Sequence, residues 1–214
     1  MGRINRGWTN ARRWPGPRWP AIVLLTLLVT GCGGGALEPL GPGDVILAFG
    51  DSLTEGVGAT EENSYPVQLE ALSGLPVVNA GVSGETTAEG RERLAEVLED
   101  TQPSLVILLT GGNDVLRNQD LEEARRNLAA MIEMSRERGV QVVLVGVPEK
   151  SLFSRSAPIY GELAEEYDLP LIDGLVASLL RRPGYKSDAV HLNADGYREM
   201  AERIHRFLVE EGAL

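Results

Sequence analysis

The sequence predicts a doubly wound α/β sandwich, in which a parallel β-sheet lies between two layers of helices. Two observations lead to this prediction: short apolar runs rich in β-branched residues, and charged amphipathic segments that alternate strictly with them. Such runs are typical of strands buried on both faces of a parallel sheet, joined by right-handed crossovers. Because ligands bind outside the carboxyl ends of such strands, we expect functional residues directly after the apolar runs.

Five apolar runs are expected to form the strands of one parallel sheet. In chain order they are VILAFG (45–50), LPVVNAG (75–81), SLVILLTGG (104–112), QVVLVGVP (141–148) and LPLIDG (169–174). Each is short and continuously apolar, which indicates a buried strand rather than a surface one.

Four amphipathic segments are expected to form helices between and after these strands. They are TAEGRERLAEVLED (87–100), DLEEARRNLAAMIEMSRERG (120–139), APIYGELAEEY (157–167) and ADGYREMAERIHRFLVEEG (194–212). Asn193 is a suitable N-cap for the last of them, and Gly139 a suitable stop for the second.

Residues 1–32 have the pattern of a signal peptide. Five arginines and no acidic residue precede the apolar run AIVLLTLLV, which is too short to span a bilayer. The following VTGC (29–32) resembles the lipobox of bacterial lipoproteins. This resemblance implies lipidation of Cys32, the sole cysteine, and extracytoplasmic attachment to the periplasmic face of a bacterial membrane, with Gly33 favouring the outer membrane. The alternative is an ordinary cleaved signal or an uncleaved anchor.

Residues 33–43, GGGALEPLGPG, predict a flexible tether, which leaves 44–214 as one domain. Removing residues 1–32 takes away five of the 20 basic residues and none of the 31 acidic ones, so the net charge becomes −16. Nucleic acid is a poor partner for such a surface, because phosphate contacts need clustered Lys and Arg. A monomer is the default expectation.

Candidate site residues follow the apolar runs, where the fold predicts a site. They are Ser52 after the first run, Gly84 after the second, Asn113 after the third, and Asp188 and His191 between the fifth run and the last helix. The only other histidine, His205, lies inside that helix, where it is expected to be a surface or boundary side chain.

These residue types together indicate acyl transfer by a serine. A serine hydroxyl becomes a good nucleophile when an imidazole accepts its proton, and His191 could do so if Asp188 fixes its tautomer. The resulting oxyanion needs fixed donors, which the N–H groups of Ser52 and Gly84 and the amide of Asn113 could supply. No metal or organic cofactor is required.

Four motifs resemble those of the GDSL or SGNH hydrolases, in the order and at the separations usual for that family. They are GDSLTEG (50–56), SGET (83–86), GGND (111–114) and DAVH (188–191). The resemblance is closest to the thioesterase, lysophospholipase and arylesterase branch. It implies a flavodoxin-like αβα fold and hydrolysis of esters or thioesters. It also implies Ser52 as nucleophile, His191 as base, Asp188 as its orienter, and Ser52, Gly84 and Asn113 as oxyanion donors.

Two acidic residues near these motifs favour structural roles. Asp51 is expected to hydrogen-bond local backbone, and Asp114 to cap or brace its loop. The segment 148–158, with Leu152 and Phe153, is a candidate substrate loop.

The sequence thus predicts a lipid-anchored, extracytoplasmic serine esterase acting on a small acyl ester or lipid-like substrate. Three alternatives stay open: a carbohydrate deacetylase on the same fold, a noncatalytic binding lipoprotein, and metal-dependent phosphotransfer at Asp51, Asp114 and His191.

Overall fold

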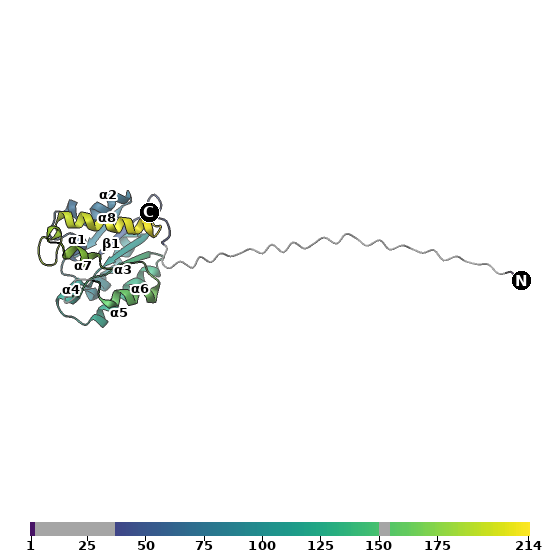
Figure 1. The fold of residues 1–214 in the computed structure, drawn as a ribbon. Helices are drawn as coiled ribbons and strands as arrows, with labels where there is room; N and C mark the ends of the chain where they lie inside the picture. The colour runs from purple at the N-terminus through teal and green to yellow at the C-terminus, as the bar shows by residue number, and fades with distance from the viewer. Residues whose placement is uncertain (3–36, 150–154) are drawn as a thin grey trace. The chain divides into compact units, whose positions relative to one another are not determined.

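The computed structural model describes residues 1–2, 37–149 and 155–214. Its centre is a sheet of parallel strands in the order β2-β1-β3-β4-β5 (Figure 1). The strands are β1 (Ile46–Gly50), β2 (Val77–Gly81), β3 (Leu105–Leu109), β4 (Gln141–Val145) and β5 (Leu171–Ile172). This is the flavodoxin-like order, in which the chain reverses direction across the sheet between β1 and β3. The predicted fold class is confirmed.

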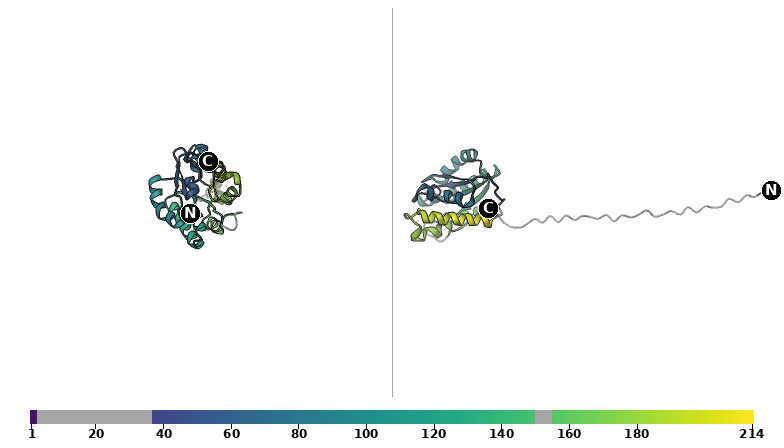
Figure 2. Two further views of the ribbon diagram at one scale, coloured as in Figure 1. Left: turned by 90° about the vertical axis from the view of Figure 1, so that its left-hand side faces the viewer. Right: turned by 90° about the horizontal axis from the view of Figure 1, so that it is seen from above.

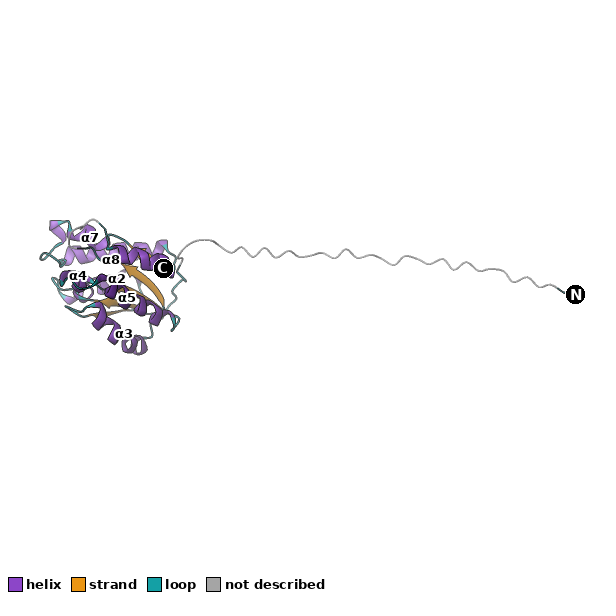
Figure 3. Ribbon diagram, turned by 90° about the horizontal axis from the view of Figure 1, so that it is seen from below, coloured by secondary structure: helices purple, strands orange, loops and turns teal. Residues whose placement is uncertain are grey.

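Helices cover both faces of the sheet (Figures 2 and 3). On one face α2 and α7 pack against α8, and on the other α5 packs against α3 and α6. Their bounds are α2 (Tyr65–Ser73), α3 (Thr87–Thr101), α5 (Leu121–Arg136), α6 (Pro158–Tyr167), α7 (Leu175–Leu180) and α8 (Ala194–Glu210). Two short helices, α1 (Ser52–Glu55) and α4 (Gly112–Leu116), directly follow β1 and β3, and 3₁₀ turns lie at Glu61–Asn63 and Pro183–Tyr185.

The core lies between the sheet and the two helical layers. Every residue of β1 and β3 is buried, as their unbroken apolar runs predict. Large buried tyrosines reach from the helices towards the carboxyl edge of the sheet. Tyr160 of α6 donates to the Thr110 carbonyl at 2.7 Å, and Tyr197 of α8 donates to the Val57 carbonyl at 2.7 Å. These bonds fix loops at the edge where β1 and β3 end.

The four predicted helices form within a few residues of their expected bounds. Asn193 is the N-cap of α8 as expected, since its side chain accepts from the Gly196 N–H at 2.9 Å. Gly139 lies three residues beyond the end of α5, in a left-handed conformation with φ of +74°. Helices α2 and α7 were not predicted.

The start of the domain differs from the expected flexible tether. Over residues 37–43 the chain is attached to the domain, with the Leu37 N–H donating to Glu211 and the Leu40 N–H to Ala213. Residues 33–36, the signal peptide and Cys32 lie outside the described part of the chain. Within the described part, no helix is long and apolar enough to cross a membrane.

Candidate active site

Ser52 stands on a sharp turn between β1 and α1. A Cβ atom on Gly50 would lie 1.9 Å from the Leu109 carbonyl oxygen, so only glycine lets β1 end this close to β3. The chain turns at Asp51, and Ser52 is the first residue of α1. The short helix ends at Gly56, with φ of +100°. This turn places the serine at the carboxyl edge of the sheet.

The Asp51 carboxylate bonds local backbone, as predicted. It accepts a hydrogen bond from the Leu53 N–H at 3.1 Å and is only 3% exposed. Burial disfavours the charged form and raises the pKa of Asp51 to about 6, although the N–H groups of Leu53 and Gly112 oppose this effect. Asp51 therefore links the start of α1 to the start of α4.

His191 lies between Ser52 and Asp188. Its Nε2 is 3.1 Å from the Ser52 Oγ, and its Nδ1 is 2.7 Å from an Asp188 carboxylate oxygen. The other carboxylate oxygen of Asp188 accepts from the N–H groups of Val190 and His191, both at 2.8 Å. The hydrogen bond from His191, helped by the backbone bonds, lowers the pKa of Asp188 to about 2. Ser52 and the distant pair Asp188 and His191 thus form one hydrogen-bonded chain.

Gly84 and Asn113 lie on neighbouring segments, the turn after β2 and the first turn of α4. Asn113, in the first turn of α4, donates its side-chain N–H to the Glu85 carbonyl at 2.9 Å. Gly84 precedes Glu85 and has φ of +82°, which favours glycine. Its N–H donates to no other residue among 37–149 and 155–214. An N–H group of Gly84 and one N–H of Asn113 are therefore free to bind a ligand.

Asp114 braces this loop, as predicted. Its buried carboxylate accepts from the Thr87 N–H at 2.9 Å and from the Thr87 hydroxyl at 2.6 Å. These bonds attach α4 to the start of α3, so Asn113 is carried on a fixed element.

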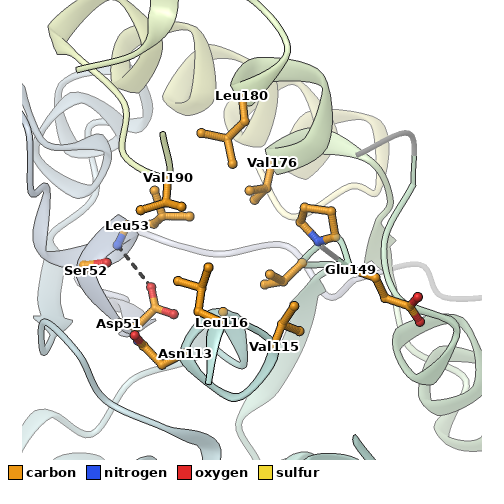
Figure 4. A pocket seen from close by; sticks show the side chains of 13 residues that line it. Asp51, Ser52, Leu53, Asn113, Val115, Leu116, Glu149, Val176, Leu180 and Val190 are labelled. Carbon is orange, nitrogen blue, oxygen red and sulfur yellow. Dashed lines mark hydrogen bonds between the residues drawn. The ribbon is translucent and has the colours of Figure 1, made fainter. Parts of the chain in front are cut away.

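An apolar pocket opens beside Ser52 (Figure 4). Ser52, Asp51 and Asn113 form one wall, and Val176 and Leu180 of α7 lie across from them. The other lining residues are Leu53, Gly112, Val115, Leu116, Val147, Pro148, Glu149 and Val190. Gly84, Asp188 and His191 are not part of this lining. The pocket can therefore receive an apolar group whose polar end meets Ser52.

The remaining candidates from the sequence are His205, the substrate loop and a metal site. His205 is on α8 and lines a separate surface hollow with Leu72 and Val209. Of the candidate substrate loop, Pro148 and Glu149 line the pocket, whereas Leu152 and Phe153 lie outside the described residues. In the described ranges, no group of three His, Cys, Asp or Glu side chains is arranged to hold a metal ion.

Sequence reasoning missed one partly buried ion pair near the site, between Glu85 and Arg93 of α3. Opposite charges eight residues apart, with a helix start between them, give no recognisable spacing pattern.

Comparisons with known proteins point to one family of hydrolases. The model of the "GDSL-like Lipase/Acylhydrolase family" matches residues 48–199. "Thioesterase 1/protease 1/lysophospholipase L1" of Escherichia coli K12 is 28% identical, over 86% of this chain and 89% of its own. AlinE4, described as an SGNH-hydrolase family esterase, is 36% identical, covers 80% of this chain and 97% of its own, and superposes with a TM-score of 0.62. The "Uncharacterized lipoprotein YqeF" of Bacillus subtilis is 30% identical, over 58% of this chain and 54% of its own.

Proposed function

The chain belongs to the GDSL-like lipase/acylhydrolase family, and from this premise we propose that it cleaves carboxylic esters or thioesters through a covalent acyl-enzyme on Ser52. The observation that supports this mechanism most strongly is the hydrogen-bonded chain from Asp188 through His191 to Ser52. Two short contacts to the two ring nitrogens of one imidazole are what a general base and its orienting carboxylate require.

In the proposed reaction the Ser52 Oγ attacks the acyl carbonyl carbon while His191 Nε2 takes the hydroxyl proton. The tetrahedral intermediate collapses, the bond to the leaving group breaks, and His191 gives its proton to the departing alcohol or thiol. Water then attacks the acyl-serine with His191 again as base, which releases the acid and restores Ser52. Asp188, anionic because its pKa is near 2, holds the imidazole with its Nδ1 proton towards the carboxylate.

The oxyanion of each intermediate would be bound by the N–H groups of Ser52 and Gly84 and by the Asn113 amide. Asn113 uses one side-chain N–H on the Glu85 carbonyl, which leaves its second N–H for the substrate. Donors fixed in place before the reaction stabilise the transition state more than the ground state.

The pocket beside Ser52 supports an acyl chain as the group recognised. Its walls are mostly aliphatic side chains, which bind a hydrocarbon by removing it from water. We therefore favour aliphatic acyl esters or thioesters over the acetylated sugars that a carbohydrate deacetylase would take.

Labelling and a pair of histidine variants test the proposal. A fluorophosphonate should modify Ser52, and Ser52→Ala and His191→Ala should each lower ester turnover by about 10³-fold or more. His205→Ala is the matched control, because it removes the only other histidine, and its turnover should equal that of the wild type. An adduct on another residue, or full turnover by Ser52→Ala, would reject the mechanism.

A substrate panel distinguishes the alternatives. We expect hydrolysis of p-nitrophenyl esters with a dependence on chain length. A strong preference for acetylated oligosaccharides would favour the deacetylase, and ligand binding without any turnover would favour the noncatalytic lipoprotein.

We also propose that Cys32 carries the lipid that attaches the protein to the periplasmic face of a bacterial membrane. The VTGC sequence and the similarity to a protein named as a lipoprotein support this. Incorporation of an alkyne fatty acid into the wild type but not into Cys32→Ser is expected. Equal labelling of both would contradict the assignment.

A further inference from the structure

The turn formed by residues 82–85 carries the backbone that meets Asn113. The Glu85 carbonyl accepts from the Asn113 amide at 2.9 Å, and the Gly84 carbonyl accepts from Arg117 at 2.7 Å. The orientation of the Asn113 amide and of the Gly84 N–H therefore depends on where this turn is held.

Arg93 of α3 holds the turn from the interior side. Its Nε and Nη2 donate to the two oxygens of the Glu85 carboxylate at 2.5 and 2.9 Å. The same Nη2 reaches the carbonyls of Ala80, at 2.7 Å, and Gly50, at 3.4 Å, where β2 and β1 end. The guanidinium lies over the Phe49 ring, 4.1 Å from its centroid. Arg93 thus joins the turn to the ends of two strands.

Forming this ion pair requires both charges to lose much of their hydration, because the Glu85 side chain is 4% exposed and that of Arg93 is 24% exposed. Taking two charges out of water offsets much of their attraction, so such a pair is a weak device for stability. The pair can instead fix the local geometry, because a guanidinium that binds both oxygens of one carboxylate determines the position and the plane of that carboxylate.

We propose that Arg93 is a positioning residue of the oxyanion hole, which acts through Glu85 on the Asn113 amide and the Gly84 N–H. The inference rests on the proposed function. Arg93 touches neither the substrate nor the reacting atoms. It fixes residue 85, whose carbonyl selects the orientation of the Asn113 side chain and whose neighbour supplies the second donor.

Because displaced donors weaken transition-state binding and leave the apolar pocket intact, Arg93→Met should lower kcat by about 10- to 100-fold with KM changed less than about twofold. Arg93→Lys keeps the charge without the planar fork and should recover only part of the loss. Arg203→Met is the matched control. Arg203 pairs with Glu199 at 2.7 Å on α8, and its side chain is 26% exposed, so this variant removes a similar ion pair far from the turn.

A double-mutant cycle separates positioning from a general structural role. Asn113→Ala removes one donor, so Arg93→Met should cost much less in that background than in the wild type. A loss from Arg93→Met that is fully retained in the Asn113→Ala background would overturn the inference. So would a kcat for Arg93→Met within about threefold of that of the control Arg203→Met.

Two further measurements keep the outcome clear. If Arg93→Met does not fold, as judged by circular dichroism and thermal unfolding, Glu85→Gln and Arg93→Lys are measured in the same cycle against the same criteria. Ser52→Ala is included in every assay. An inactive Ser52→Ala beside a fully active Arg93→Met rejects only this inference, whereas a fully active Ser52→Ala rejects the proposed function itself.

Discussion

Replacing Asp51 with asparagine should change how the stability of the protein depends on pH. The Asp51 carboxylate is buried beside Ser52, and desolvation raises its pKa from 3.8 to about 6. Asparagine has nearly the same shape, is an equally good N-cap, and can still accept the Leu53 N–H bond. The substitution therefore removes the titration while leaving the start of α1 largely intact.

The sign and size follow from the two pKa values. At low pH both folded and unfolded chains hold the proton, but between 3.8 and about 6 only the folded chain keeps it. The protonated Asp51 side chain therefore stabilises the fold fully below pH 3.8, its pKa in the unfolded chain. This stabilisation is lost as the pH rises through about 6, its pKa in the folded chain. One unit of pKa shift corresponds to about 1.36 kcal/mol, so the free energy of unfolding changes by about 3 kcal/mol in total. About 2 kcal/mol of this change falls between pH 4 and pH 7.

Urea unfolding of both proteins at several pH values measures this effect. The free energy of unfolding of Asp51→Asn minus that of the wild type should rise by about 2 kcal/mol from pH 4 to pH 7. Asp44→Asn is the control, because hydrogen bonds from Ser104 and Gly41 lower the pKa of the Asp44 carboxylate. The free energy of unfolding of Asp44→Asn minus that of the wild type should therefore fall, not rise, as the pH increases. A flat or falling difference for Asp51→Asn would refute the reasoning.

Three further outcomes are expected. Leu180→Trp should fill the pocket and move the preference in a p-nitrophenyl ester series to shorter chains, by about fourfold in kcat/KM for each methylene excluded, and an unchanged series would contradict the assigned pocket. Asp114→Ala should lower the free energy of unfolding by about 2 kcal/mol, because it removes the acceptor of the buried Thr87 N–H and of the Thr87 hydroxyl proton, whereas the exposed control Asp195→Ala should change it little. Ester turnover should be unchanged by a chelator, and its loss would favour metal-dependent chemistry.

The sheet and the positions of the polar residues could be predicted because the sequence encodes them locally. The runs that became β1 and β3 are apolar at every position, which only a strand buried on both faces requires. Since parallel strands end at one edge, residues after those runs had to lie near one another. Ser52 and Asn113 do line the same pocket.

Features that depend on packing were missed. Helix α7 is almost wholly buried, so its residues show no polar face and no helical periodicity. Helix α2 is short and buries only Tyr65, Pro66 and Leu69, too few residues for a clear pattern. The Glu85–Arg93 pair exists only because a turn and a helix come together in the fold.

The described part of the expected tether, residues 37–43, differs from the prediction for a similar reason. Its Gly and Pro content is typical of a flexible linker, but Leu37 is buried and residues 37 and 40 pair with the chain after α8. Composition describes what a segment can do by itself and does not show what lies beside it.

The place where the chain enters the domain has a consequence for access to the active site. Leu37 meets the end of α8, and the neighbouring Glu38 bonds Gln141 at the amino end of β4. Ser52 follows the carboxyl end of β1, so it lies at the opposite edge of the parallel sheet. Five residue steps from Cys32 to Leu37 extend at most about 17 Å. A lipid at Cys32 would therefore attach the domain at the amino edge of the sheet, opposite the pocket beside Ser52. Esters would then enter the pocket from the surrounding solution rather than from the bilayer that holds the lipid.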